Sequence, residues 1–190
     1  MFGSRRAGNP VEISVEAQVR TQHYHPAAKA LHWLVAVLLC AVVPLGFLQK
    51  LVKEDVYAYV NFWHLSLGFT LFLVMLARLG VRLLTKTPGS PAGTPPWASR
   101  LAAWNHWLLY AALICEPILG YLTTNAQGYP LVWFDVIPIW SPFGKSPAAD
   151  TILAVHLYLA WVIVGLVLLH ICGVLYHRLI RRDDSLARMT

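Results

Sequence analysis

The stretch TILAVHLYLAWVIVGLVLLHICGVLYH, residues 151–177, decides the fold of this chain. It contains no Asp, Glu, Lys or Arg. A helix needs roughly 20 apolar residues to cross the hydrocarbon core of a bilayer, so this stretch can span a membrane with some tilt. Two histidines, His156 and His170, lie within it. Their separation is close to four helical turns, so both rings leave the same face of the helix, roughly 21 Å apart along its axis.

The composition indicates an integral membrane protein. Of the 190 residues, 57% are hydrophobic and only 13% are charged, which is about half the charged share of a soluble domain. The formal net charge is +6, and its placement at the ends of apolar runs favours membrane orientation over nucleic-acid binding. The cysteines lie inside apolar runs and indicate no disulfide framework. They are Cys40, Cys115 and Cys172.

The apolar runs predict an all-α fold, a transmembrane four-helix bundle, in one membrane domain of residues 25–182. Polar tails flank this domain at residues 1–24 and 183–190. Residues 124–150 are rich in proline and aromatic residues and are expected to lie on the membrane surface, because their prolines would break a fifth span. The four spans are expected at approximately residues 30–49, 56–84, 101–123 and 151–178.

Basic residues gather on one side of the predicted bundle. Four spans place both termini and the second connection on the same side. Twelve Lys and Arg residues lie there: Arg5, Arg6, Arg20, Lys29, Arg78, Arg82, Lys86, Arg100, Arg178, Arg181, Arg182 and Arg188. The opposite side has Lys50, Lys53 and Lys145. The positive-inside rule therefore predicts that both termini are cytoplasmic, in a multi-pass protein of the bacterial inner membrane.

The predicted topology sorts four histidines into two layers. His64 and His156 lie toward the outer ends of their spans, whereas His32 and His170 lie toward the cytoplasmic ends. Ionisable residues within spans are rare and mark functional sites. Two facing imidazoles suit the axial positions of a haem iron better than zinc, which needs four ligands. No Cys-x-x-Cys-His occurs, so the pattern favours non-covalent, b-type haem.

A small residue follows each of these histidines by about one helical turn and would let a flat macrocycle approach the backbone. The small residues are Ala36, Gly68, Ala160 and Gly173. A fifth histidine, His106, begins the third span at the depth of His32 and His170. By geometry alone, His106 could replace His32 as a ligand.

Further polar residues have candidate roles. His177 lies about two turns beyond His170 at the cytoplasmic interface, where an imidazole could exchange protons with a bound quinone. Glu116 is the only acidic residue deep in a span, and it could relay protons. Arg78 and Arg82 could pair with the carboxylates of a haem or simply anchor the second span in the interface.

Four segments of the chain resemble the prokaryotic cytochrome b561 family of four-helix, di-haem membrane proteins. They are HPAAKALHWL, FWHLSLGFTLFLVMLARLGVRL, GYPLVWF and AVHLYLAWVIVGLVLLH. The resemblance covers about residues 24–185 and implies two b-type haems, one with His32 and His170 as iron ligands and one with His64 and His156. It thereby favours His32 over His106, and it places His177 near quinone.

The resemblance also implies electron transfer across the membrane, with exchange of electrons with the quinone pool or a redox partner. Such a partner would be a periplasmic dehydrogenase or a c-type cytochrome. Some family members resemble stand-alone superoxide oxidases with quinone as acceptor, which is the alternative function. A metal or proton transporter that uses the intramembrane histidines and Glu116 is the alternative of another class. It predicts no bound chromophore. Membrane lipid is an expected partner and nucleic acid is not.

Overall fold

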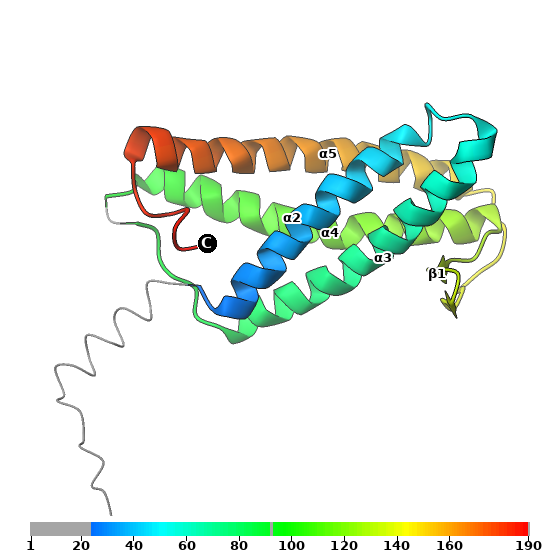
Figure 1. The fold of residues 1–190 in the computed structure, drawn as a ribbon, viewed down its shortest axis with the longest axis horizontal. Helices are drawn as coiled ribbons and strands as arrows, with labels where there is room; N and C mark the ends of the chain where they lie inside the picture. The colour runs from blue at the N-terminus through cyan, green and yellow to red at the C-terminus, as the bar shows by residue number, and fades with distance from the viewer. Residues whose placement is uncertain (1–23, 92, 190) are drawn as a thin grey trace, which may run out of the picture.

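Four long helices form the molecule in the computed structural model, which describes residues 24–91 and 93–189 (Figure 1). Each is long and apolar enough to cross a membrane, which confirms the predicted transmembrane four-helix bundle. Nearly all of the predicted N-terminal tail, residues 1–24, lies outside the described residues. The helices are α2 (Pro26–Leu48), α3 (Glu54–Leu84), α4 (Pro96–Gln127) and α5 (Ala149–Leu175).

The bundle has two distinct ends. The start of α2, the connection from α3 to α4 and the end of the chain lie at one end, which we call the tail end (Figure 1). The connections from α2 to α3 and from α4 to α5 lie at the other, the cap end. Helix α2 packs on α3, α3 on α4, and α4 on α5. Opposite ends of the bundle therefore correspond to the two membrane faces of a four-span protein.

A thin apolar core runs along the axis of the bundle. Leu71, Met75 and Ile163 are almost fully buried in it. Large apolar side chains such as Val37 and Trp161 point outward and are 66% and 63% exposed. Outward-facing apolar side chains of this kind suit contact with lipid, because a helix that is apolar all round is stable in a membrane.

Helix α4 extends beyond the span expected at residues 101–123. It begins at Pro96, because proline at the first helical position loses no hydrogen bond and has a helical φ. It ends at Gly128, whose φ of 91° is left-handed and favours glycine. Residues 124–127 therefore continue the helix instead of belonging to the surface segment. Hydrogen bonds to the carbonyl oxygen of Tyr121 from the side chains of Thr124 (2.9 Å) and Asn125 (2.7 Å) stabilise this last turn.

The cap segment, residues 128–148, folds over α3 and α4 at the cap end. It contains a short antiparallel hairpin of β1 (Val132–Trp133) and β2 (Ile137–Pro138). The indole Nε1–H of Trp133 donates to Thr70 Oγ1 at 3.1 Å, and the backbone N–H of Phe134 donates to Ser66 Oγ at 3.2 Å. The hairpin is thus hydrogen-bonded to hydroxyl groups on α3.

The chain turns back across the tail end after α5. A π-helical segment, η1 (Tyr176–Arg181), continues α5, and Arg182 then adopts a left-handed φ of 55°. The indole Nε1–H of Trp33 donates to the carbonyl oxygen of Met189 at 3.0 Å, and Arg188 Nη1 donates to that of Gly89 at 3.2 Å. The C-terminal segment is therefore hydrogen-bonded both to α2 and to the segment between α3 and α4.

Candidate functional site

Two histidines face each other near the cap end. We call His64 on α3 and His156 on α5 the cap pair. Their ring centroids are 6.3 Å apart and their planes are inclined by 75°. Two imidazoles bound through nitrogen to one metal, with bonds of about 2 Å each, would have centroids roughly 6 Å apart. The cap pair therefore has the separation that two axial ligands of one iron need.

Backbone carbonyl groups hold both rings of the cap pair. Nδ1 of His64 lies 3.0 Å from the carbonyl oxygen of Val42 on α2, and Nδ1 of His156 lies 3.2 Å from that of Glu116 on α4. A carbonyl oxygen only accepts, so each Nδ1 must carry the proton. Each Nε2 is then the unprotonated nitrogen that can bind a metal, as is usual for metal-binding histidines.

Two glycines allow this close approach. An added Cβ would lie 2.8 Å from Cε1 of His64 at Gly46, and 3.2 Å from Cε1 of His156 at Gly120. Each glycine is four residues after the carbonyl that holds the same ring, so ring, glycine and carbonyl share one helix face. The sequence pattern did not identify these glycines, although their depth in the first and third spans matches that of the cap pair.

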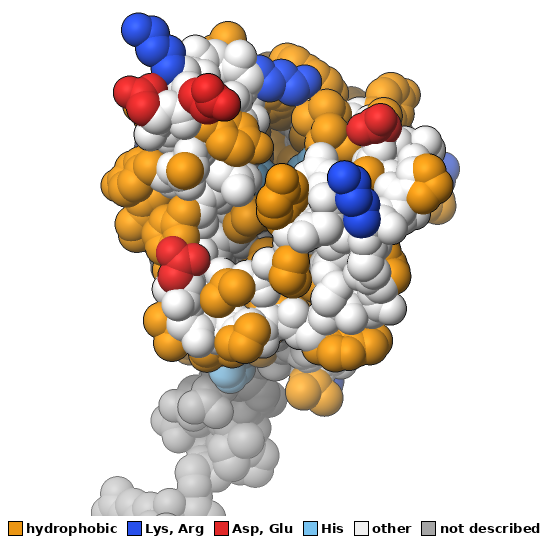
Figure 2. Space-filling model, turned by 90° about the vertical axis from the view of Figure 1, so that its right-hand side faces the viewer, with side chains coloured by type: hydrophobic (Ala, Val, Ile, Leu, Met, Phe, Trp, Pro, Cys, Tyr) orange, Lys and Arg blue, Asp and Glu red, His pale blue; other side chains and the backbone are white. Residues whose placement is uncertain are grey.

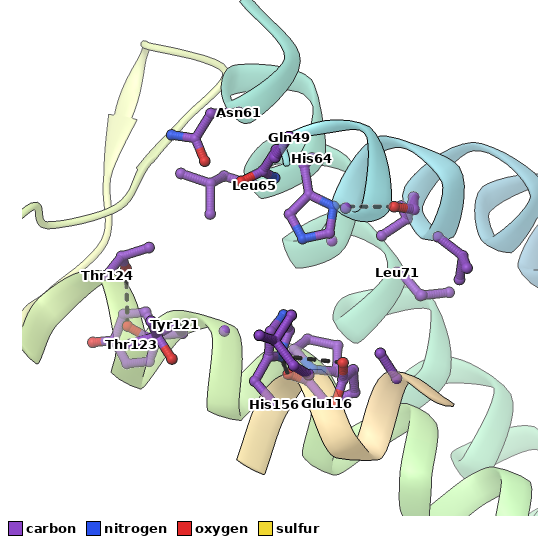
Figure 3. A pocket seen from close by; sticks show the side chains of 18 of the residues that line it. Gln49, Asn61, His64, Leu65, Leu71, Glu116, Tyr121, Thr123, Thr124 and His156 are labelled. Atoms are coloured by element: carbon purple, nitrogen blue, oxygen red, sulfur yellow. Dashed lines mark hydrogen bonds and ion pairs between the residues drawn. The ribbon is translucent and has the colours of Figure 1, made fainter. Parts of the chain in front are cut away.

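A cavity of about 290 Å³ lies at the cap pair, and both rings line it (Figure 3). Gly68 and Ala160, the small residues predicted beside these histidines, also line it. A Cβ on Gly68 would meet no atom within 4 Å. At the cap end the surface is hollowed, and histidine side chains are visible inside the hollow (Figure 2). The space beside the rings fits a flat cofactor.

Glu116 lies directly against the cap pair. Its Oε1 is 3.2 Å from Nδ1 of His156, so this ring has a carboxyl oxygen as well as a carbonyl oxygen beside its N–H. The other carboxyl oxygen, Oε2, is buried without a hydrogen-bond partner. Glu116 is thus a neighbour of the candidate ligand and not an isolated polar residue of the span.

Three histidines meet near the tail end, and we call His32, His106 and His170 the tail trio. His170 is central: its ring centroid is 6.0 Å from that of His32 and 5.3 Å from that of His106. The separation from His32 is close to that of the cap pair. A Cβ on Gly173, the small residue predicted after His170, would meet no atom within 4 Å.

Arg78 lies beside the tail trio. Its guanidinium donates to the carbonyl oxygen of Ala28 at 3.1 Å and lies over the ring of Tyr110, 5.6 Å from the centroid. Within residues 24–91 and 93–189, no three His, Cys, Asp or Glu side chains form a group that could hold a bare metal ion. Paired imidazoles with room for a macrocycle therefore fit haem better than zinc.

His177 lies at the tail end in a separate polar cluster. Its Nδ1 is 2.7 Å from Asp183 Oδ2 and 3.2 Å from Ser185 Oγ. Burial by itself would raise the pKa of Asp183, but hydrogen bonds from Ser185, His177 and Arg181 outweigh it and hold that pKa below its ordinary value. An ionised Asp183 accepts a hydrogen bond from Nδ1–H of His177, so Nε2 of His177 is the nitrogen left for a ligand.

Known proteins match nearly the whole chain. The family described as "Prokaryotic cytochrome b561" matches residues 23–190. "Cytochrome b561 homolog 2" of Escherichia coli (strain K12) is 31% identical over 173 residues, covering 88% of this chain and 91% of that protein. "Probable superoxide oxidase CybB" of Yersinia pestis is 27% identical over 159 residues, covering 84% and 90%. "Cytochrome b561 homolog 1" of Escherichia coli (strain K12) is 25% identical over 167 residues, covering 84% and 92%.

Proposed function

Because this chain belongs to the prokaryotic cytochrome b561 family of haem-containing, electron-transferring membrane proteins, we propose that it transfers electrons across the bacterial inner membrane through two b-type haems. The cap pair, His64 and His156, binds one iron. His32 and His170 from the tail trio bind the other. The observation that supports this most is the 6.3 Å separation of the cap pair, combined with backbone acceptors on both Nδ1 atoms.

Residues of the chain orient the histidines that would bind the haem. Val42 and Glu116 fix the tautomer of the cap pair through their carbonyl groups, so that both Nε2 atoms are free to bind iron. Gly46 and Gly120 keep the rings close to α2 and α4. Haem b, when bound, supplies an iron that takes up and releases one electron.

His106 has a different role from His32 in this proposal. Its centroid is 5.3 Å from that of His170, which is shorter than the separation of roughly 6 Å that two ligands of one iron need. The 6.0 Å distance between His32 and His170 fits that requirement. His106 is therefore assigned to the surroundings of this haem, and His32 to the iron.

Quinone is the proposed partner at the tail end, which the positive-inside rule predicts to face the cytoplasm. Asp183 and Ser185 hold Nδ1 of His177 and leave Nε2 for a quinone oxygen. Reduction of a quinone consumes protons as well as electrons, and histidine exchanges protons near neutral pH. A periplasmic dehydrogenase or c-type cytochrome would deliver electrons at the cap end.

A stand-alone superoxide oxidase is the second candidate function. It is favoured by the 27% identity to the Yersinia pestis protein named a probable superoxide oxidase. The discriminating assay is reduction of quinone by the isolated protein when superoxide is supplied. Quinone reduction in that assay supports the enzyme, whereas a need for a partner protein supports the partner-coupled cytochrome.

The experiment that tests the proposal is a reduced-minus-oxidised absorption spectrum of the purified protein. We expect the spectrum of b-type haem with two axial histidines. A metal or proton transporter that uses Glu116 and the intramembrane histidines predicts no bound chromophore. A correctly folded protein without haem absorbance would therefore contradict the proposal and favour the transporter.

A further inference from the structure

The two histidine layers have different polar neighbours. In the cap pair, Nδ1 of His156 has Glu116 Oε1 at 3.2 Å as well as a backbone carbonyl. Glu116 Oε2 is buried and has no hydrogen-bond partner among the described residues, so no hydrogen bond at Oε2 competes with the contact of Oε1 with His156. Figure 3 shows Glu116 beside His156 at the edge of the cavity.

The tail trio has basic neighbours instead. The guanidinium of Arg78 donates to the carbonyl oxygen of Ala28, one helical turn before His32, and lies over the ring of Tyr110, one turn after His106. Within residues 24–91 and 93–189, no carboxylate forms an ion pair with a ring of the tail trio. The hydrogen bond of Arg78 to Ala28 and its contact with Tyr110 keep the positive charge in place without neutralising it.

These surroundings change the stability of oxidised iron in opposite directions. An acceptor on the far nitrogen of an axial histidine makes the ligand more basic and stabilises the oxidised, more positive iron. A nearby guanidinium repels that extra positive charge and stabilises the reduced iron. In a span the charges are poorly screened, because little water surrounds them.

We propose that Glu116 and Arg78 make the cap-end haem the lower-potential centre and the tail-end haem the higher-potential centre. This inference rests on the proposed function. It means that a protein holding one electron keeps it at the tail end, beside His177. The chain then favours movement of electrons from the cap end to the tail end, which is inward if the tail end is cytoplasmic.

Redox titration of the purified protein at one fixed pH tests this assignment. We expect two steps in the haem absorbance. Glu116→Leu removes the acceptor, so it should raise the midpoint potential of the lower step and leave that of the upper step unchanged. Glu116→Gln should raise the lower midpoint potential less, because the amide oxygen still accepts. Arg78→Leu should lower the midpoint potential of the upper step, and Arg78→Lys, which keeps the positive charge, should leave it unchanged. The two steps should converge in the Glu116→Leu/Arg78→Leu double variant.

Matched controls are carboxyl and guanidinium groups without a contact to these rings. Glu54→Gln and Arg100→Gln should leave both steps unchanged. This inference would be overturned, and the proposed function left intact, if Glu116→Leu binds two haems and neither midpoint potential changes. A change in the upper midpoint potential of that variant would overturn it as well. A protein without haem would overturn both. The Glu116 variants remove a buried, partly unpartnered group, so loss of folding is not expected to obscure the result.

Discussion

At the scale of single residues, backbone oxygens decide what the cap pair can bind. A histidine that can donate from either nitrogen becomes a defined metal ligand only when one nitrogen has an acceptor. Val42 and Glu116 supply those acceptors from α2 and α4. The histidines come from α3 and α5, so all four helices contribute to one site.

Gly120→Ala should reduce binding of the cap-end haem. The added methyl group would lie 3.2 Å from Cε1 of His156 and push the ring away from its acceptor, at a cost of about 1–3 kcal/mol typical of overpacking. Gly46→Ala should act on His64 in the same way and more strongly, because the distance there is 2.8 Å. The measurement is haem absorbance per protein.

Gly80→Ala is the control for these variants, since its Cβ would meet no atom within 4 Å. It should retain full haem content. Equal haem contents in Gly46→Ala, Gly120→Ala and Gly80→Ala would show that the close approach of ring and glycine has no role in binding.

The histidines themselves could be predicted from the sequence, but their neighbours could not. Helical periodicity and depth in the membrane place His64 with His156. They leave both His32 and His106 at the depth of His170, and only the resemblance to the cytochrome b561 family favours His32. The contact of His156 with Glu116 depends on how α4 rotates against α5. The contact of His177 with Asp183 depends on the turn at Arg182. A single sequence without structure contains neither rotation nor turn geometry.

At the scale of elements, the cap segment depends on polar groups that α3 exposes toward it. Ser66 is 1% exposed and its hydroxyl accepts from the backbone N–H of Phe134. Thr70, one turn later, accepts from the indole of Trp133. Hydroxyl groups buried in an apolar span are stable only when they have hydrogen-bond partners, so these contacts fix where the hairpin lies.

Ser66→Ala should loosen the hairpin without unfolding the bundle. The variant leaves the N–H of Phe134 without its partner, which costs about 1–3 kcal/mol when the group stays buried. Hydrogen exchange of residues 131–139 should become faster, and exchange within α3 should not change. Ser99→Ala, a serine in the first turn of α4 at the opposite end of the bundle, is the control. Unchanged exchange in Ser66→Ala would contradict the assigned contact.

The boundaries of α4 show what limits prediction at this scale. Apolar content predicts residues 101–123, whereas the helix covers Pro96–Gln127. The additional turns contain proline and polar residues, and they are stable because of a proline start, a glycine end and side-chain hydrogen bonds within the last turn. Hydropathy detects the part of a helix that meets lipid and not the parts that extend beyond it.

At the scale of the whole molecule, charge and topology together predict orientation. The tail end of the bundle carries the start of α2, the α3–α4 connection and the end of the chain (Figure 1). In the sequence, 12 of the 15 Lys and Arg residues lie near these parts: before or at the start of α2, from the end of α3 to the start of α4, or from the end of α5 onward. The positive-inside rule then predicts a cytoplasmic tail end. The higher-potential haem would lie at that face, next to His177.

Reporter fusions test this orientation. A reporter attached after Thr190 that is active only in the cytoplasm should be active, and one attached in the cap segment, for instance after Lys145, should not. A reporter that is active only in the periplasm should show the reverse pattern. A periplasmic signal from the C-terminal fusion would show that the molecule has the opposite orientation, and the proposed direction of electron flow would then be reversed.

The pairing of histidines around two irons is tested most directly by the ratio of haem to purified protein across a set of variants. We predict a ratio of two for the unaltered chain. We predict one for His64→Ala, for His156→Ala and for the double variant that combines them, because both residues bind the same iron. The His64→Ala/His170→Ala double variant should have none, and His106→Ala should keep two. A ratio of zero in the His64→Ala/His156→Ala double variant, with the fold intact, would contradict the account.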